Sequence, residues 1–210
     1  MGLIAREGLY LSTIPGALTV FAFFTGGMVP GAAGAAVTLA IALFFRDPER
    51  TADLKEGEIV CPADGRVVAV TNDPSPRNIP DGGFRISVFM SILNVHINRI
   101  PVDGKVLAVH HVPGGFSMAH LDEAMINNER TEILLEDGSQ RRFLMVQVAG
   151  MVARRIVCRL KEGDEVRAGQ RFGLICFGSR VDLYMPPGVE PLVGAGDKVR
   201  AGLTVMAAMK

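Results

Sequence analysis

The sequence predicts a mainly β protein of the α+β class. Its β domain is expected to be pseudo-symmetric and similar to a barrel or sandwich, and to follow an N-terminal apolar helical hairpin. Three observations support this: residues 8–45 contain no charged side chain, short β-branched runs alternate with Gly, Pro and Asp turns after them, and two sequence words each occur twice. Closely spaced runs and turns are typical of barrels and sandwiches. We expect two domains, residues 1–50 and residues 51–210.

The apolar segment is predicted to anchor the chain in the cell membrane. It contains IPGALTVFAFFTGGM and AAGAAVTLAIALFF, with the turn signal VPG at residues 29–31 between them. Each piece is shorter than the roughly 20 residues of a spanning helix, so a crossing hairpin and a half-inserted one are both open. Arg6, Arg46 and Arg50 place the following domain on the cytoplasmic side. A signal peptide is disfavoured because the segment has no convincing cleavage site. The remaining alternative is a helical hairpin that is buried in a soluble protein.

The repeated words predict the pseudo-symmetry of the β domain. PADGRVVAV at residues 62–70 recurs as PVDGKVLAV at 101–109, and GDEVRAG at 163–169 recurs as GDKVRAG at 196–202. Such echoes indicate duplicated hairpins. The second word also resembles the turns of biotinyl and lipoyl carrier domains. A non-enzymatic, membrane-tethered carrier module is therefore one alternative function, with Lys210 as its modified residue, although no strand follows that lysine.

The composition and the cysteine spacing argue against several classes of protein. The 22 basic residues equal the 22 acidic residues, and a net charge of zero argues against a nucleic-acid partner. Cys61, Cys158 and Cys176 are odd in number and widely spaced, which fits neither a metal site nor a disulfide framework. We interpret them as small apolar residues in a reducing compartment, and we expect no metal.

Gly178 and Ser179 interrupt an otherwise apolar, strand-like run, GLICFGSRVDLYMP, at residues 173–186. A Gly-Ser pair is often only a turn. A serine nucleophile would need a base, and the base usually needs an orienting carboxylate. The histidines available as a base are His96, His110, His111 and His120.

Several long words, taken in order, resemble the short-form phosphatidylserine decarboxylases. They are FFRDPER, CPADGRV, NVHINRIPVDGKV, PGGFSMAHLDEAMINNERTE, VQVAGMVARRIV, EGDEVRAGQRFGLICFGSRVDLYMP and GDKVRAG. The resemblance covers residues 44–210 together with the anchor. It implies decarboxylation of phosphatidylserine to phosphatidylethanolamine. Decarboxylation of archaetidylserine would leave the same signature, and a membrane serine hydrolase using Ser179 is a further alternative.

The resemblance also implies self-cleavage between Gly178 and Ser179. The products would be a β chain of residues 1–178 and an α chain of residues 179–210 that begins with a pyruvoyl group made from Ser179. This group would serve as the electron sink, without pyridoxal phosphate.

The resemblance further implies that Asp64 orients His96 and that His96 deprotonates Ser179. Arg99 stands where longer bacterial relatives carry a second histidine, so it is open whether His96 serves both maturation and turnover. The residues expected to bind the substrate are Arg46, Arg50, Arg99, Asn128 and Arg130. A helix is expected in SMAHLDEAMINNER, at residues 117–130, and could close over the lipid. The expected partner is phosphatidylserine in the membrane, and a homodimer is left open.

Overall fold

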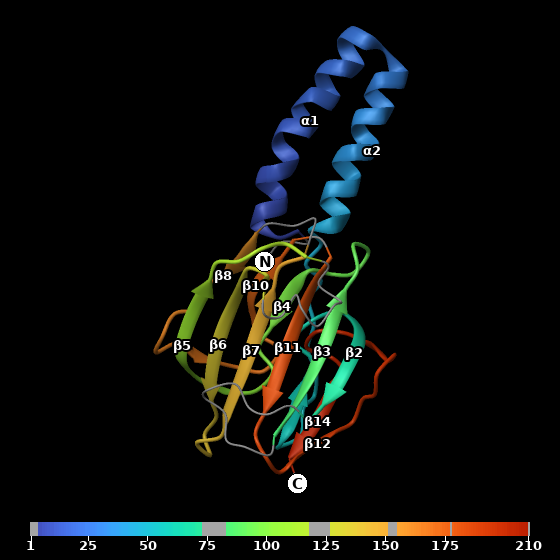
Figure 1. The fold of residues 1–210 in the computed structure, drawn as a ribbon. Coiled ribbons are helices and arrows are strands. Elements are labelled where there is room, and N and C mark those ends of the chain that lie inside the picture. Colours follow the sequence, from blue (N-terminus) through green and yellow to red (C-terminus); the bar gives the residue numbers. More distant parts are fainter. Residues whose placement is uncertain (1–3, 73–82, 118–126, 151–154, 177, 210) are drawn as a thin grey trace. The chain divides into compact units, whose positions relative to one another are not determined.

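The chain forms two compact units, Met1–Glu49 and Arg50–Lys210. The computed structural model describes residues 4–72, 83–117, 127–150, 155–176 and 178–209 (Figure 1). Most of the helix expected around His120, and the terminal Lys210, lie outside these residues. The second unit is built of strands, and the expectation of a mainly β protein is confirmed.

The first unit is the expected apolar hairpin, made of α1 (Arg6–Gly26) and α2 (Met28–Phe44). The two helices approach closely where a glycine of one meets a threonine of the other. A Cβ on Gly34 would lie 2.7 Å from Oγ1 of Thr19, and the hydroxyls of Thr19 and Thr38 are 3.2 Å apart. Small residues at such a contact are typical of helices that pack in apolar surroundings.

The turn between the helices lies earlier than the sequence suggested. It is made by Gly27, whose φ of +85° favours glycine, whereas residues 29–31 belong to the first turn of α2. The VPG prediction was therefore wrong. Pro30 is compatible with that position because N–H groups in the first helical turn need no intrahelical acceptor. Among the described helices, α1 is long and apolar enough to cross a membrane, and α2, with 17 residues, is shorter.

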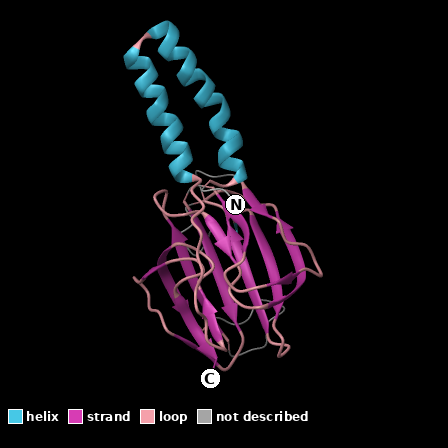
Figure 2. Ribbon diagram, turned by 180° about the vertical axis from the view of Figure 1, so that it is seen from behind, coloured by secondary structure: helices cyan, strands magenta, loops and turns pink. Residues whose placement is uncertain are grey.

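Within its described residues, the second unit contains one eight-stranded antiparallel sheet and two three-stranded sheets (Figures 1 and 2). The large sheet has the order β13-β2-β3-β11-β7-β6-β5-β9. Its strands are β2 (Gly65–Thr71), β3 (Phe84–Met90), β5 (Gly104–Val112), β6 (Arg130–Glu136), β7 (Arg142–Val148), β9 (Glu165–Val166), β11 (Ser179–Met185) and β13 (Lys198–Val199). The small sheets comprise β1 (Glu58–Val60), β14 (Val205–Met209) and β12 (Val189–Pro191), and β4 (Ile97–Arg99), β10 (Arg171–Ile175) and β8 (Ile156–Cys158).

One apolar core joins the three sheets. It combines Val88 and Val181 of the large sheet with Phe172 of β10 and Met206 of β14, each at most 1% exposed. Alternating side chains of a strand point to opposite faces, so the small sheets cover the face of the large sheet that carries these valines. A second cluster, which includes Leu144 and Tyr184, lies on the other face.

The repeated words form equivalent antiparallel strand pairs at the two edges of the large sheet, and each pair joins two words that are far apart in the chain. The first word supplies β2 and β5, and the second supplies their edge partners, so Gly65 pairs with Val199 as Gly104 pairs with Val166. The pseudo-symmetric arrangement predicted from the repeats is confirmed.

The aspartate of the first word has the same structural role in both copies. Asp64 Oδ1 accepts the N–H of Ala201 at 2.8 Å, and Asp103 Oδ1 accepts the N–H of Ala168 at 2.7 Å. The first copy has an additional partner, Arg50, which donates both terminal nitrogens to the Asp64 carboxylate, one of them to Oδ2 at 2.8 Å. The Arg50 and Asp64 side chains are only 9% and 10% exposed. This buried ion pair distinguishes the first copy from the second.

Replacing Asp64 with alanine is expected to destabilise the second unit by about 3–5 kcal/mol, because Arg50 would lose its carboxylate in a buried position. The matched change Asp103→Ala removes one hydrogen bond at an exposed turn and is expected to cost about 1 kcal/mol. Thermal unfolding of the full chain in detergent, followed by circular dichroism, should show the lower midpoint for Asp64→Ala. Equal midpoints would contradict the structural importance of the ion pair.

Candidate active site

The expected cleavage bond lies where the chain crosses from a small sheet to the large one. Strand β10 ends at Ile175 and β11 begins at Ser179 (Figure 1). Gly178 has a φ of +63°, and a Cβ there would meet nothing within 4 Å. The backbone angle, and not a lack of space, therefore favours glycine; another residue would be strained by roughly 1–2 kcal/mol.

Ser179 is fully buried at the start of a central strand. Strand β11 pairs with β3 on one side and β7 on the other, and Ser179 lies opposite Met90. The Ser179 hydroxyl has no hydrogen-bond partner among the described residues. A buried, unsatisfied hydroxyl costs roughly 1–3 kcal/mol, so this position is locally unfavourable for folding.

His96 lies beside the same crossing. It is 2% exposed and directly precedes β4, and its carbonyl accepts the N–H of Ile175 at 3.4 Å. His96 is therefore next to Ile175, the last residue of β10, and Ile175 is four residues before Ser179 in the chain.

A buried polar contact connects β4 to the face of the large sheet that carries Ser179. Asn98 Nδ2 lies 3.6 Å from the sulfur of Met90, the cross-strand partner of Ser179. Gln147 Nε2 donates to Asn98 Oδ1 at 2.8 Å, and Gln147 is the cross-strand partner of Val181, two residues beyond Ser179. Positions two apart in a strand share a face, so Asn98 packs on the Ser179 side of the sheet.

His96 directly precedes β4, and its backbone is hydrogen-bonded to Ile175 at the end of β10, so it is buried next to the connection that leads to Ser179. The predicted base and the predicted nucleophile are thus both buried on segments that adjoin the β10–β11 connection. Asn98 and Gln147 were not predicted from the sequence. Only the alternation in NVHINRIP, which places Asn98 on the His96 side of the strand, could have indicated one of them.

Asp64 lies on a segment next to β4, since Pro62 accepts the N–H of Arg99 at 2.9 Å. Its carboxylate accepts hydrogen bonds from Arg50 and from the backbone of Ala201. Orientation of His96 by Asp64 stays a prediction, and the described contacts give Asp64 the additional role of holding Arg50.

Two of the predicted substrate-binding residues make internal hydrogen bonds here. Arg99 is 3% exposed and donates to the carbonyl of Gly169 at 2.8 Å. Asn128 is fully buried, and its amide donates to the carbonyls of Ser117 and Ala149, each at 2.8 Å.

Asn128 therefore connects the segment of Ser117 to Ala149. Ala149 directly follows Val148, and Val148 is the cross-strand partner of Arg180, so this contact supports the strand next to Ser179. Arg130 donates to Glu132 at 2.7 Å, and Arg46, in the first unit, donates to the carbonyl of Leu43 at 2.7 Å. Their expected contacts with substrate stay predictions.

Arg180 and Asp182 form a second buried ion pair, on the opposite face of β11. Arg180 donates its Nε to Asp182 Oδ1 at 2.6 Å and its NH2 to Oδ2 at 3.0 Å, and neither residue is more than 1% exposed. Because the two residues are two positions apart in one strand, the pair secures the residues that directly follow Ser179. The sequence shows both charged residues within an apolar run, but it did not predict that Arg180 and Asp182 pair with each other.

Two of the three cysteines, Cys61 and Cys158, are unsuited to nucleophilic chemistry. All three are free thiols; burial raises the pKa of Cys61 to about 12, and burial also raises the pKa of Cys158. A thiol with a raised pKa is protonated at neutral pH and is a weak nucleophile. This agrees with their interpretation as small apolar residues.

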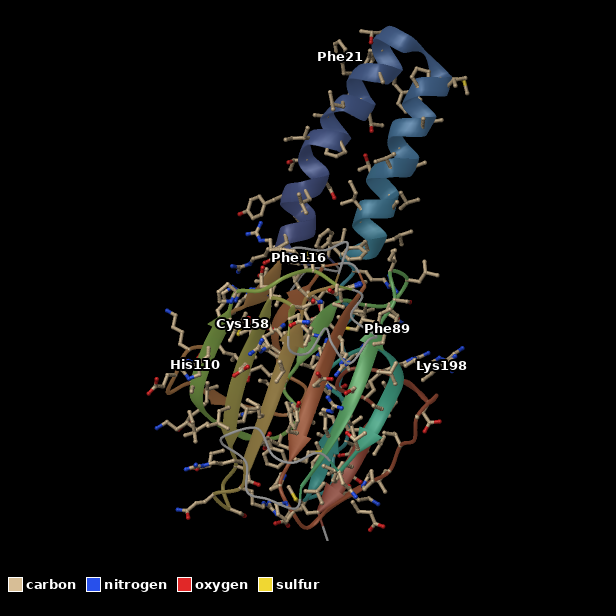
Figure 3. All side chains as sticks on the ribbon, viewed as in Figure 1. Phe21, Phe89, His110, Phe116, Cys158 and Lys198 are labelled. Carbon is tan, nitrogen blue, oxygen red and sulfur yellow. The ribbon has the colours of Figure 1, made fainter. Side chains whose placement is uncertain are left out.

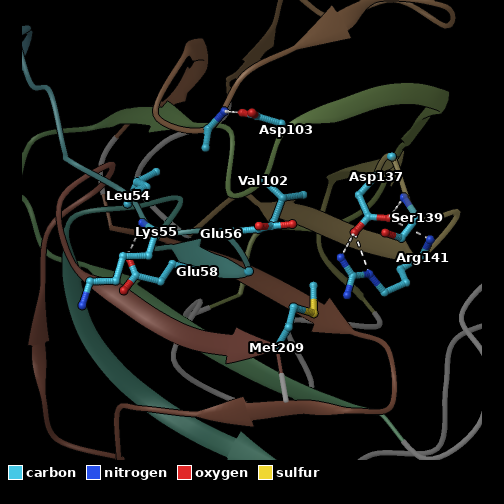
Figure 4. A pocket seen from close by; sticks show the side chains of 13 residues that line it. Leu54, Lys55, Glu56, Glu58, Val102, Asp103, Asp137, Ser139, Arg141 and Met209 are labelled. Carbon is cyan, nitrogen blue, oxygen red and sulfur yellow. Dashed lines mark hydrogen bonds and ion pairs between the residues drawn. The ribbon is translucent and has the colours of Figure 1, made fainter.

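A surface cavity of about 390 Å³ is lined by residues that include Asp137, Ser139 and Arg141 (Figure 4). It is next to the turn that joins Glu136 to Arg142, whereas Ser179 lies near the far end of β7. Asp137, which lines this cavity, is occupied by hydrogen bonds from Ser139 and Arg141 of its own turn. We therefore assign no chemistry to it.

Comparison with known proteins identifies the family of this chain. The family model for phosphatidylserine decarboxylase matches residues 37–207. The chain is 47% identical over 210 residues to a phosphatidylserine decarboxylase proenzyme of Paramagnetospirillum magneticum, covering 99% of this chain and 82% of that protein. Proteins of the same name from Ruegeria pomeroyi and Rickettsia akari are 46% and 40% identical, covering 96% and 98% of this chain and 93% and 90% of their own lengths. The chain therefore belongs to the phosphatidylserine decarboxylase family, a family of carboxy-lyases, as the resemblance predicted.

Proposed function

We propose that this chain cuts itself between Gly178 and Ser179 and then converts phosphatidylserine to phosphatidylethanolamine with release of CO2. The observation that carries the proposal is the buried, unpartnered hydroxyl of Ser179, directly after a glycine in the left-handed region. The word proenzyme in the names of the relatives supports maturation by cleavage.

The proposed cleavage requires no reactant other than groups of this chain and one water molecule. His96 takes the proton of Ser179 Oγ, and the oxygen attacks the carbonyl carbon of Gly178. The Gly178–Ser179 C–N bond breaks and the nitrogen takes up the proton, leaving an ester. Loss of the Ser179 Cα proton then expels Gly178 as a carboxylate, and water replaces the nitrogen, which leaves as ammonia.

The residues around Ser179 fit a pyruvoyl group at that position. The group occupies no more space than the serine from which it forms, and Gln147 Oε1 is another buried atom without a partner among the described residues. When formed, it supplies an electron sink for loss of the substrate carboxylate. Asn98 and Gln147 supply polar side chains on this side of the sheet, and His96 is the proposed proton donor to the product.

The sheet explains how the two products stay together. Strand β11 would belong to the α chain, while both of its neighbours, β3 and β7, would belong to the β chain. Strands β13 and β14 of the α chain likewise pair with β2 and β1. We propose the membrane as the location, with α1 and α2 as the anchor and the second unit on the cytoplasmic side.

Changing Ser179 to alanine should abolish cleavage. Intact-protein mass spectrometry should find one full-length chain, and CO2 release from phosphatidylserine should be lost. The wild type should give chains of residues 1–178 and 179–210. Ser87→Ala is the matched control, because Ser87 is also fully buried with an unpartnered hydroxyl, on the neighbouring strand. Wild-type protein that is active yet uncut at Ser179 would refute the proposal.

Changing His96 to glutamine should slow cleavage by about 10²–10⁴-fold, the usual contribution of a general base. The fraction of cut chain is followed by gel electrophoresis after synthesis in a cell-free system. His110→Gln serves as the control, since His110 is an exposed residue of β5 (Figure 3). Equal cleavage rates for the two variants would remove His96 from the maturation step.

The two chains should remain associated without a covalent bond. Purified, cleaved protein should elute from a size-exclusion column in mild detergent as one species that contains both chains. They should separate only under denaturing conditions, because separation requires β11 to leave both of its neighbours. Dissociation on dilution alone would show that the pairing does not hold the α chain.

A further inference from the structure

The turn after β3 presents two aliphatic side chains to solvent. Ile92 is 54% exposed and Leu93 is 84% exposed. The turn is held by its own polar groups, since Asn94 Oδ1 accepts from the N–H and the hydroxyl of Ser91, each at 2.8 Å. An ordered turn with two exposed aliphatic residues indicates an interaction surface.

Three basic residues lie next to this turn. Arg66, Lys198 and Arg200 are exposed and line a cavity of about 670 Å³ together with Ser91 and Asn94. Arg66 and Lys198 are direct cross-strand partners, and Arg200, two residues after Lys198, follows on the same face.

Like charges directly opposite each other destabilise a sheet, so the Arg66–Lys198 pair calls for an explanation. The acidic residue among the described lining residues is Asp64, whose carboxylate is already engaged by Arg50 and Ala201. The cavity is therefore suited to an external anion.

The second repeat provides an internal comparison. At the positions equivalent to Arg66 and Lys198 it has Lys105 and Glu165, which are cross-strand partners of opposite charge. This strand pair thus accommodates a glutamate at the position equivalent to Lys198, and the fold does not require two basic residues there.

This basic surface lies at the same end of the large sheet as Ser179. Phe89 is the cross-strand partner of both Arg66 and Arg180, and the next residue, Met90, is the partner of Ser179. Figure 3 shows Phe89 on β3 and Lys198 beside β2, with the lysine pointing away from the sheet.

We propose that Ile92, Leu93, Arg66, Lys198 and Arg200 form a docking surface for an anionic phospholipid bilayer. The basic residues meet lipid phosphates, and the two aliphatic side chains enter the interface. A soluble anion would use the basic residues alone, whereas a bilayer surface offers both chemistries. The inference extends the proposed function, because docking brings the Ser179 end of the sheet to its lipid substrate.

The test uses tryptophan fluorescence, since the chain contains no tryptophan. Full-length Leu93→Trp in the Ser179→Ala background is placed in nanodiscs of phosphatidylcholine, with or without phosphatidylglycerol. Phosphatidylglycerol is anionic but is not the proposed substrate. We expect a blue shift and protection from acrylamide only in the anionic discs, and loss of both at high salt. Leu192→Trp, at an exposed position elsewhere in the unit, should show neither effect.

Lys198→Glu is the decisive variant. It reproduces the charge pair of the other repeat, so its unfolding midpoint should not fall, yet the docked-to-undocked ratio should drop about 30-fold for a change of two charges. Lys161→Glu, the same charge change at another exposed site, should leave docking intact.

A blue shift that is equal in both disc types, or that persists in Lys198→Glu, would overturn the docking proposal. Self-cleavage of the otherwise wild-type chain would be unaffected by that result. Conversely, failure of the decarboxylase proposal would leave the fluorescence result unchanged.

Discussion

The arrangement of the second unit depends on the hydrogen bonding of β11 along both of its edges. Because Ser179 is the first residue of this strand, the sheet fixes everything after it whether or not the preceding peptide bond is intact. The preceding strand, β10, ends at Ile175 and belongs to another sheet. The chain must therefore change sheets within three residues, and Gly178 provides the left-handed angle for this change. A bond at such a crossing can break without loss of the fold.

Burial of apolar side chains on β11 offsets the unfavourable free energy of the unsatisfied Ser179 hydroxyl. Val181, Leu183 and Met185 are fully buried, and burial of each such side chain contributes about 1.5–3 kcal/mol. The unsatisfied hydroxyl of Ser179 opposes folding by roughly 1–3 kcal/mol, which is less than these three side chains contribute together. The site is thus an unfavourable local arrangement held by a favourable strand.

Local patterns predicted the fold class, the hairpin and the Gly-Ser break, because charge gaps, turn residues and repeats are read along the chain. They failed where the deciding contact was distant or where two signals competed. Gly27 formed the turn instead of VPG because proline is tolerated in a first helical turn. The contact between Asn98 and Gln147 joins residues 49 positions apart, and that between Arg50 and Asp64 joins two irregular segments 14 positions apart, so neither leaves a periodic signal.

The duplication separates what the fold needs from what a function needs. Features present in both copies, such as the aspartate that accepts an alanine N–H, are explained by the architecture alone. Features present in only one of the two copies are not explained by the architecture and require a different cause. Arg50 beside Asp64 and Lys198 opposite Arg66 both belong to the copy next to β3, the strand that pairs with Ser179. The two departures from symmetry therefore lie on one flank, and that flank adjoins the candidate active site.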